Sequence, residues 1–197
     1  MKRLWHNKKL ACVVAGFVLT SCATTVPATS YYLLNGSRSP SIRSHPAGAT
    51  TVYVRRVDVP AYLARPGLVT MNGGVRVAYA ETALWAESLD QGMARAVAEA
   101  LSENSRIRAF AFSPAGPPPD HNYDVSIRVE RFEGTDAGQV ILRARWSVST
   151  SDSSASIASG TTEIRRSGWQ LGDYPGLVRI LGDEVAQMSR QIARVIP

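Results

Sequence analysis

The chain has few of the residues that usually bind metals or act as nucleophiles. Its 197 residues include two cysteines, Cys12 and Cys22, and three histidines. Cys12 lies in an N-terminal segment that we expect to be removed, and we expect Cys22 to be chemically capped. No free thiol would then remain for a disulfide, a thiolate metal site or a cysteine nucleophile. Of the histidines, His45 and His121 follow that segment in Pro- and Gly-rich loops, whereas zinc usually takes three or four protein ligands. We therefore expect no metal site and no cofactor.

Catalytic motifs are missing as well. The sequence has no Gly-x-Ser-x-Gly elbow for a serine hydrolase. The pair Gly73-Gly74 lacks the further glycines and the lysine of a phosphate-binding loop, so it is typical of a turn. Asp120 and His121 are adjacent and offer an acid–base pair, but no nucleophile accompanies them. We expect a protein that is not an enzyme.

Long apolar runs are also lacking. The stretch 10–19, "LACVVAGFVL", has ten residues, and a membrane-spanning helix needs about 20. It follows Lys2, Arg3, Lys8 and Lys9, with no acidic residue before it. A basic start followed by a short apolar stretch and small residues is typical of an export signal.

The end of this signal fits the bacterial lipobox, in which an aliphatic residue and two small residues precede a cysteine. Here the four residues are Leu19-Thr20-Ser21-Cys22. In lipoproteins the thiol accepts a diacylglyceryl group as a thioether, a peptidase cuts before the cysteine, and the new amine is acylated. The alternative is an ordinary secretory signal with an incidental cysteine. We predict a signal peptide at 1–21, lipidation of Cys22, a tether at 22–29 and one domain at 30–197.

Lysine is confined to the predicted signal. Four of the 22 basic residues precede Cys22, which leaves 18 arginines against 16 acidic residues. This near balance does not indicate nucleic-acid binding. Three arginine groups fall on predicted strands, namely Arg55-Arg56, Arg143/Arg145 and Arg165-Arg166. They mark either a solvated sheet face or a strip that faces a partner or anionic lipid, because the guanidinium fork suits phosphates and carboxylates.

Hydrophobic periodicity predicts an α+β domain. Strands are expected at 30–35, 50–59 with a bulge near Arg55-Arg56, 68–79 as a hairpin around Asn72-Gly73-Gly74, 107–112, 124–134, 139–152 and 155–168. Amphipathic helices are expected at 83–101 and, capped by Asp173, at 174–195. The last three strands alternate like an antiparallel meander, so we expect a mainly antiparallel sheet with both helices packed on it. Trp85 and Trp146 fall on apolar stripes and should be core residues, whereas Trp169 either staples the last helix or contacts a partner.

Two further motifs follow the lipobox and the "YYLL" at 31–34. In "VRRVDVPAYLARPGLV" (54–69) the turn reads Pro-x-Tyr-Leu-x-Arg-Pro, and "YAETALWAESLDQGMARAVAEAL" (79–101) contains Trp-Ala-Glu-x-Leu. Together these features resemble the PqiC (YmbA-like) lipoproteins, also described as ABC-type transport auxiliary lipoproteins. The matching positions are Pro60, Tyr62, Leu63, Arg65, Pro66, Val69, Trp85, Ala86, Glu87 and Leu89. Leu84 departs from the pattern, which commonly has an arginine there.

The resemblance implies a lipoprotein on the periplasmic face of the outer membrane that assists lipid transport between the two membranes. Its implied partner is an MCE-domain (PqiB-like) protein of an ABC-type system, which it would dock or tether, so supporting envelope integrity. Ala23 after the cysteine, in place of an aspartate, supports outer-membrane sorting. A homo-oligomer is left open. The alternative function is a structural lipoprotein that helps to assemble another outer-membrane complex.

For the docking site we favour Tyr62 and Arg65. Pro60 and Pro66 stiffen this turn, which would present both side chains at low entropic cost. The alternative is that Tyr62 and Leu63 cover the edge of the core.

Overall fold

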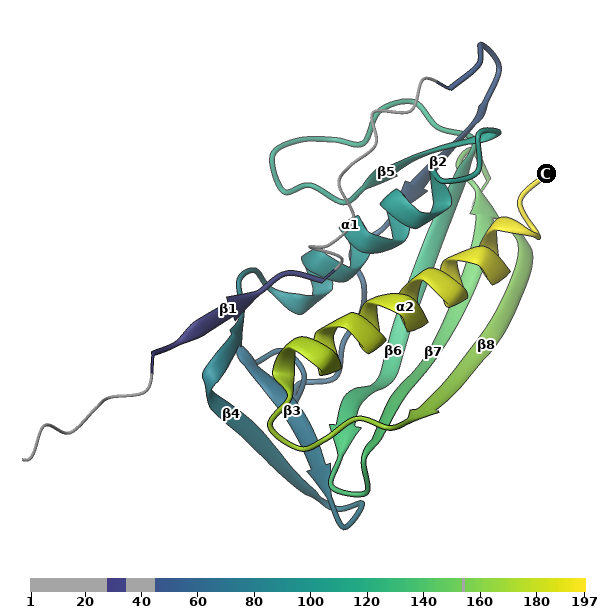
Figure 1. Ribbon diagram of the computed structural model, residues 1–197. Helices are drawn as coiled ribbons and strands as arrows, with labels where there is room; N and C mark the ends of the chain where they lie inside the picture. The colour runs from purple at the N-terminus through teal and green to yellow at the C-terminus, as the bar shows by residue number, and fades with distance from the viewer. Residues whose placement is uncertain (1–27, 35–44, 154) are drawn as a thin grey trace, which may run out of the picture.

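The computed structural model describes residues 28–34, 45–153 and 155–197 (Figure 1). The predicted signal peptide, Cys22 and most of the predicted tether lie outside these residues. Within the described ranges, no helix combines the length and the apolar character that crossing a membrane requires.

The described residues form one sheet and two helices. In chain order the elements are β1 (Ser30–Tyr32), β2 (Thr50–Val54), β3 (Gly67–Asn72), β4 (Arg76–Trp85), α1 (Leu89–Leu101), β5 (Ile107–Ala111), β6 (Tyr123–Thr135), β7 (Gln139–Thr150), β8 (Ser156–Ser167) and α2 (Tyr174–Ala193). The predicted hairpin of β3 and β4 is confirmed, with Gly73 and Gly74 at positive φ in its turn. The predicted meander of β6, β7 and β8 is confirmed too.

β6 lies at the centre of the sheet and pairs along both of its edges. One edge pairs antiparallel with β7, which in turn pairs with β8. The other edge pairs in parallel with β2 near the start of β6 and with β3 near its end. β5 extends the sheet beyond β2, and β4 followed by β1 extends it beyond β3. These two extensions therefore lie at opposite ends of β6 (Figure 1).

The expectation of a mainly antiparallel sheet is wrong, because the sheet is mixed. Of the seven strand pairings in the described ranges, four are parallel: β1 with β4, β2 with β5, β2 with β6, and β3 with β6. The three antiparallel pairings join strands that are consecutive in the chain. Turn residues mark such hairpins in a sequence, whereas a parallel pair joins distant segments and leaves no local signature.

β2 and β3 behave as two parts of one interrupted strand beside β6. The Arg55 N–H donates to the Val125 carbonyl (2.9 Å), and the Asp58 N–H donates to the Ile127 carbonyl (2.9 Å). From Arg55 to Asp58 the chain advances three residues while β6 advances two, from Val125 to Ile127. This extra residue confirms the bulge predicted near Arg55-Arg56. Pro60 then follows and has no N–H to donate, so the pairing stops until β3.

Both helices lie on the same face of the sheet (Figure 1). α2 contacts β6, β7 and β8, α1 contacts β2 and β5, and the helices contact each other. The predicted alternation holds on the covered face, where the buried residues include Val125, Ile127, Val129, Val140, Leu142, Ala144, Trp146 and Val148. The opposite face carries no helix in the described part of the chain.

α1 begins later than predicted. Apolar spacing predicted a helix over 83–101, yet the first three of these residues close β4 and α1 begins at Leu89. This end of β4 is extended because β1 pairs with it, Tyr32 lying opposite Trp85. Trp85 is partly buried, and its ring stacks on Phe132 at a centroid distance of 6.3 Å.

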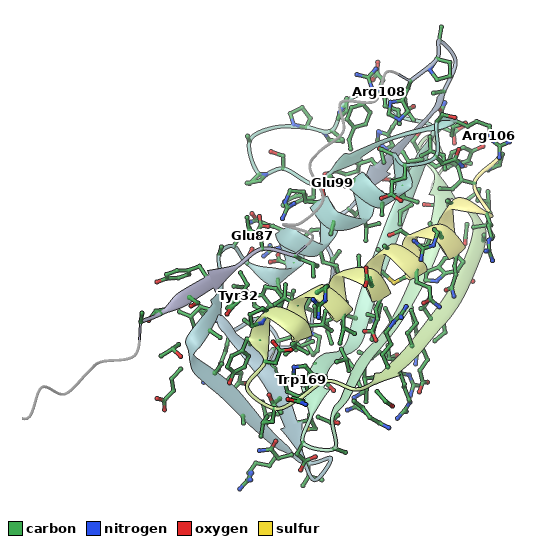
Figure 2. The ribbon with its side chains drawn as sticks, viewed as in Figure 1. Tyr32, Glu87, Glu99, Arg106, Arg108 and Trp169 are labelled. Carbon is green, nitrogen blue, oxygen red and sulfur yellow. The ribbon has the colours of Figure 1, made fainter. Side chains whose placement is uncertain are left out.

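The start of α2 is confirmed. The Asp173 carboxylate accepts a hydrogen bond from the Gly176 N–H (2.9 Å), and Pro175 lies in the first turn. The indole N–H of Trp169 donates to the Asp173 carbonyl (2.8 Å), and its side chain is buried beside this helix end (Figure 2). Of the two alternatives for Trp169, the structure supports the staple.

Arg95 of α1 fastens the N-terminal segment to the helix layer. Its Nη2 donates to the Leu34 carbonyl (3.3 Å), while its Nη1 donates to Glu99 (3.1 Å) and the side chain also pairs with Glu87. Both glutamates are labelled in Figure 2. Because β1 is a three-residue edge strand, this contact adds a second attachment at the point where the predicted tether enters the domain.

Two tryptophans are accommodated by glycines on neighbouring strands. A Cβ added at Gly160 would lie 2.5 Å from Cζ2 of Trp146, its cross-strand partner, and one at Gly134 would lie 2.6 Å from Cζ3 of Trp169. The Trp146 indole N–H donates to Thr162 (3.1 Å), which fixes the ring against movement. We infer that these glycines are required by close packing.

Gly160→Ala should therefore lower the free energy of unfolding by about 1–3 kcal/mol, because a buried ring must shift to admit the methyl group. Denaturant unfolding measures this change. Gly116→Ala is the matched control, since a Cβ there meets open space, and it should leave the midpoint unchanged. Equal midpoints for both variants would contradict the packing argument.

Glu184 of α2 is an unusual buried acid. Its side chain is fully buried, and neither carboxylate oxygen has a hydrogen-bond partner in the described ranges. Burial raises the pKa of Glu184 from its ordinary 4.5 to about 8, although the Arg166 guanidinium opposes the shift. Between these pH values the folded chain holds a proton that the unfolded chain has lost, so this group destabilises the fold as the pH rises from about 4.5 to about 8.

Glu184→Gln should consequently differ little from the wild type near pH 4 and become more stable than it, by on the order of 1–3 kcal/mol, near pH 8. Urea unfolding across this range measures the difference. Glu163→Gln is the opposite control, because hydrogen bonding to Arg165 lowers the pKa of Glu163, so the wild-type advantage there is lost as the pH falls. A pH-independent effect of Glu184→Gln would contradict the assignment.

Candidate docking surface

The turn favoured from the sequence lies in the gap between β2 and β3. It is compact, because the Leu63 N–H donates to the Pro60 carbonyl (2.9 Å) and the Ala64 N–H donates to the Ala61 carbonyl (3.3 Å). Leu63 is buried in the core and so anchors the turn.

The Tyr62 side chain points into the sheet. Its hydroxyl donates to the carboxylate of Glu133 (2.9 Å), a fully buried residue of β6. The same carboxylate accepts from the Phe132 N–H (2.8 Å) and from Nε of Arg131 (2.6 Å). Burial, and then the nearby Glu133 charge, raises the pKa of Tyr62 well above its usual value. Tyr62 thus has a structural partner, as the core-edge alternative anticipates.

Arg65 is the exposed member of the predicted pair. Its guanidinium lies 5.1 Å from the centre of the Tyr79 ring of β4, a cation–π distance. This contact orients the charge while leaving it open to solvent. The assignment of Tyr62 and Arg65 to partner binding stays a prediction, in which Tyr62 fixes the turn and Arg65 makes the contact.

The arginines predicted on β7 and β8 are brought together on the helix-free face, with one exception. Arg143 and Arg145 of β7 both pair with Glu130 of β6 (2.8 and 2.7 Å). Arg165 pairs with Glu163 on β8 (2.7 Å). The exception is Arg166, which donates to Gln187 of α2 (3.0 Å). Sequence alternation placed these arginines correctly but did not identify the carboxylates that hold them.

Arg55 and Arg56 lie beside the bulge that follows β2. Arg55 forms a two-point contact with Asp124 of β6, through Nε and Nη2 at 3.1 Å each. Arg56 pairs with Asp90, in the first turn of α1. These side chains line two shallow hollows, of about 560 and 370 Å³, that both include Arg55 and Arg56. The larger is also lined by Tyr53, Phe112, Pro118, His121, Asp124 and Ser151, and the smaller by Asp58, Ser126, Ile127, Arg128, Arg145, Trp146 and Ser147.

His121 belongs to this surface. Its Nδ1 lies 2.8 Å from the Pro119 carbonyl, its Nε2 lies 3.3 Å from Asp124, and its ring packs 5.3 Å from that of Tyr53. Across the described ranges, no group of three His, Cys, Asp or Glu residues is placed to hold a metal ion. The sequence offered no signal for this hollow, because its residues come from β2, β6, the Pro-rich loop before β6 and the segments that follow β2, β5 and β7.

Residues 32–193 match the model of a protein family described as the ABC-type transport auxiliary lipoprotein component. The chain is 27% identical over 190 residues to the intermembrane transport lipoprotein PqiC of Escherichia coli (strain K12), a match covering 96% of this chain and 97% of the relative. The PqiC of Shigella flexneri gives the same values.

Two solved structures have a similar fold. One is a crystal structure of an uncharacterized protein, with a TM-score of 0.69 and 24% identity over 85% of this chain and 98% of that one. The other is a Xanthomonas campestris protein, with a TM-score of 0.64 and 17% identity over 84% of this chain and 93% of that one.

Tyr62→Phe should lower the free energy of unfolding by about 1–2 kcal/mol, because the buried Glu133 carboxylate loses one of its donors. Thermal or denaturant unfolding measures this loss. Tyr31→Phe, at an exposed position of β1, is the control and should be neutral. If Tyr62→Phe is also neutral, the hydroxyl does not hold the turn.

Proposed function

Because the chain belongs to the family of ABC-type transport auxiliary lipoprotein components, we propose that it is the lipid-anchored accessory subunit of an intermembrane transport system. The observation that carries this proposal is the family match over 32–193. The names of the two curated relatives agree with it and favour transport over the alternative of a structural lipoprotein for another complex. The family is one of transport components, which agrees with a non-enzymatic role.

The anchor in this proposal is Cys22, on the periplasmic face of the outer membrane. The lipobox before it supports lipidation, and Ala23 after it supports outer-membrane sorting. The seven residues 23–29 span at most about 25 Å when extended, so the domain works close to the membrane surface. The Arg95 contacts with Leu34, Glu87 and Glu99 support this arrangement, since they tie the segment after the tether to the helix layer.

The partner in this proposal is the periplasmic MCE-domain component of the transporter. The domain offers it two preformed features, the compact Pro60–Pro66 turn with exposed Arg65, and the helix-free sheet face with its ordered arginines. By holding the distal end of that component at the outer membrane, the lipoprotein would complete the route between the membranes and support envelope integrity.

Expression of the full chain in its native host, beside Cys22→Ala and Arg65→Ala, tests anchor and docking separately. We expect the wild type to fractionate with the outer membrane and to co-purify the MCE component. Cys22→Ala should leave the membrane fraction, because it cannot be acylated. Arg65→Ala should remain anchored and retain several-fold less of the MCE component, whereas Arg179→Gln, on the exposed side of α2, should behave as the wild type.

Membrane retention of Cys22→Ala would contradict the lipid anchor. Full capture of the MCE component by Arg65→Ala would remove the turn from the docking site. Failure of the wild type to capture it at all would contradict the docking role.

A further inference from the structure

The ion pairs of the helix-free face share a layered arrangement. In each of them the carboxylate is less exposed than the arginine it holds. The Arg55 side chain is 52% exposed and that of Asp124 is 5% exposed, while the values for Arg145 and Glu130 are 66% and 25%. Even at the open Arg128–Asp58 pair the values are 72% and 61%. In these ion pairs the guanidinium group is thus the charge that lies nearer to solvent.

The Arg95 cluster on α1 lacks this layering. There Arg95 is 35% exposed, and its partners Glu87 and Glu99 are 31% and 37% exposed. A carboxylate less exposed than its arginine is therefore common to the arginines of the sheet face and to Arg56, whose partner Asp90 of α1 is 9% exposed against 65% for Arg56, and it does not hold for every ion pair of the described residues. An arginine that is already held by a buried carboxylate loses less side-chain entropy when it binds a ligand.

The two hollows lie within this guanidinium layer and share Arg55 and Arg56. One adds the rings of Tyr53 and Phe112, and the other adds the hydroxyl donors of Ser126 and Ser147. Together they form a shallow track across β2, β6 and β7 that offers cations, hydroxyl groups and aromatic surface. Such a track fits an extended chain that carries carboxylates at intervals.

We propose that this track, named here the arginine track and defined by Arg55, Arg56, Arg128, Arg145, Tyr53 and Ser147, binds an extended acidic segment of a protein partner. The inference deepens the proposed function, on which it rests, by giving the chemistry of the partner. A protein segment fits better than an anionic lipid, because both hollows are shallow and open to solvent, so that neither would enclose an acyl chain.

The test uses the mature lipoprotein in mild detergent and a fluorescent peptide of alternating Glu and Ser residues. Fluorescence anisotropy should show binding that weakens as salt is added, and the matched peptide of Gln and Ser should bind far more weakly. Arg128→Gln/Arg145→Gln should weaken binding of the acidic peptide by about tenfold. Arg179→Gln/Arg190→Gln, with the same change in charge on the exposed side of α2, should bind as the wild type.

One further variant and one competition experiment complete the test. Ser147→Asp leaves every arginine in place and adds a negative charge to the track, so it should also weaken binding, even if the double variant folds poorly. Glycerophosphoglycerol, the free headgroup of phosphatidylglycerol, should not displace the peptide.

Equal loss of binding in the two double variants would overturn the proposal, since net charge alone would then explain it. Displacement by the headgroup would assign the track to anionic lipid instead. Neither result would alter the outcome of the Cys22 and MCE-capture experiments, so failure here is distinguishable from failure of the transport role.

Discussion

The backbone ladder along β6 holds the two ends of the sheet together. On one edge β6 pairs with β2 and then with β3, and on the other it pairs with β7 throughout. The first edge is interrupted because a bulge and then Pro60 end the donor series, and the chain between Pro60 and Pro66 leaves the sheet as a compact turn. The turn and the arginines beside the bulge, which are the candidate docking features, exist because this ladder is broken and then resumed.

The two faces of the sheet are used differently. Helices cover one face and close the core over tryptophans that pack against glycines. The other face carries ion pairs in which the carboxylate is less exposed than the arginine that it holds. The two buried glutamates differ in the same way. The Glu133 carboxylate accepts hydrogen bonds from Tyr62, Arg131 and a backbone N–H, whereas Glu184 of α2 has no such donors in the described ranges. The sheet face thus presents ordered arginines to solvent.

The sequence predicted those elements of the fold that depend on residues close together in the chain. Alternation located the β6–β7–β8 meander, Asn72-Gly73-Gly74 located a hairpin, and Asp173 with Pro175 located the start of α2. The parallel pairings were not predicted, because each depends on contacts between segments far apart in the chain. For the same reason the predicted first helix ran into the end of β4, which is a strand because β1 pairs with it.

The candidate site was predictable in composition and less so in geometry. The arginines of β7 and β8 could be placed on strands, and Tyr62 and Arg65 could be placed in one turn. Their different surroundings could not be foreseen, since Glu133 lies about seventy residues beyond Tyr62 in the chain. The hollow beside His121 was likewise hidden, because it is assembled from several strands and a Pro-rich loop.

We propose that the helix-free sheet face of this lipoprotein meets the protein component of an intermembrane transporter. In-cell photo-crosslinking tests it most directly, with a photoreactive residue placed either at Ser147 on the sheet face or at Arg179 on α2. We expect a crosslink to the MCE-domain component from position 147 and none from position 179. Crosslinking from position 179 with none from position 147 would contradict it.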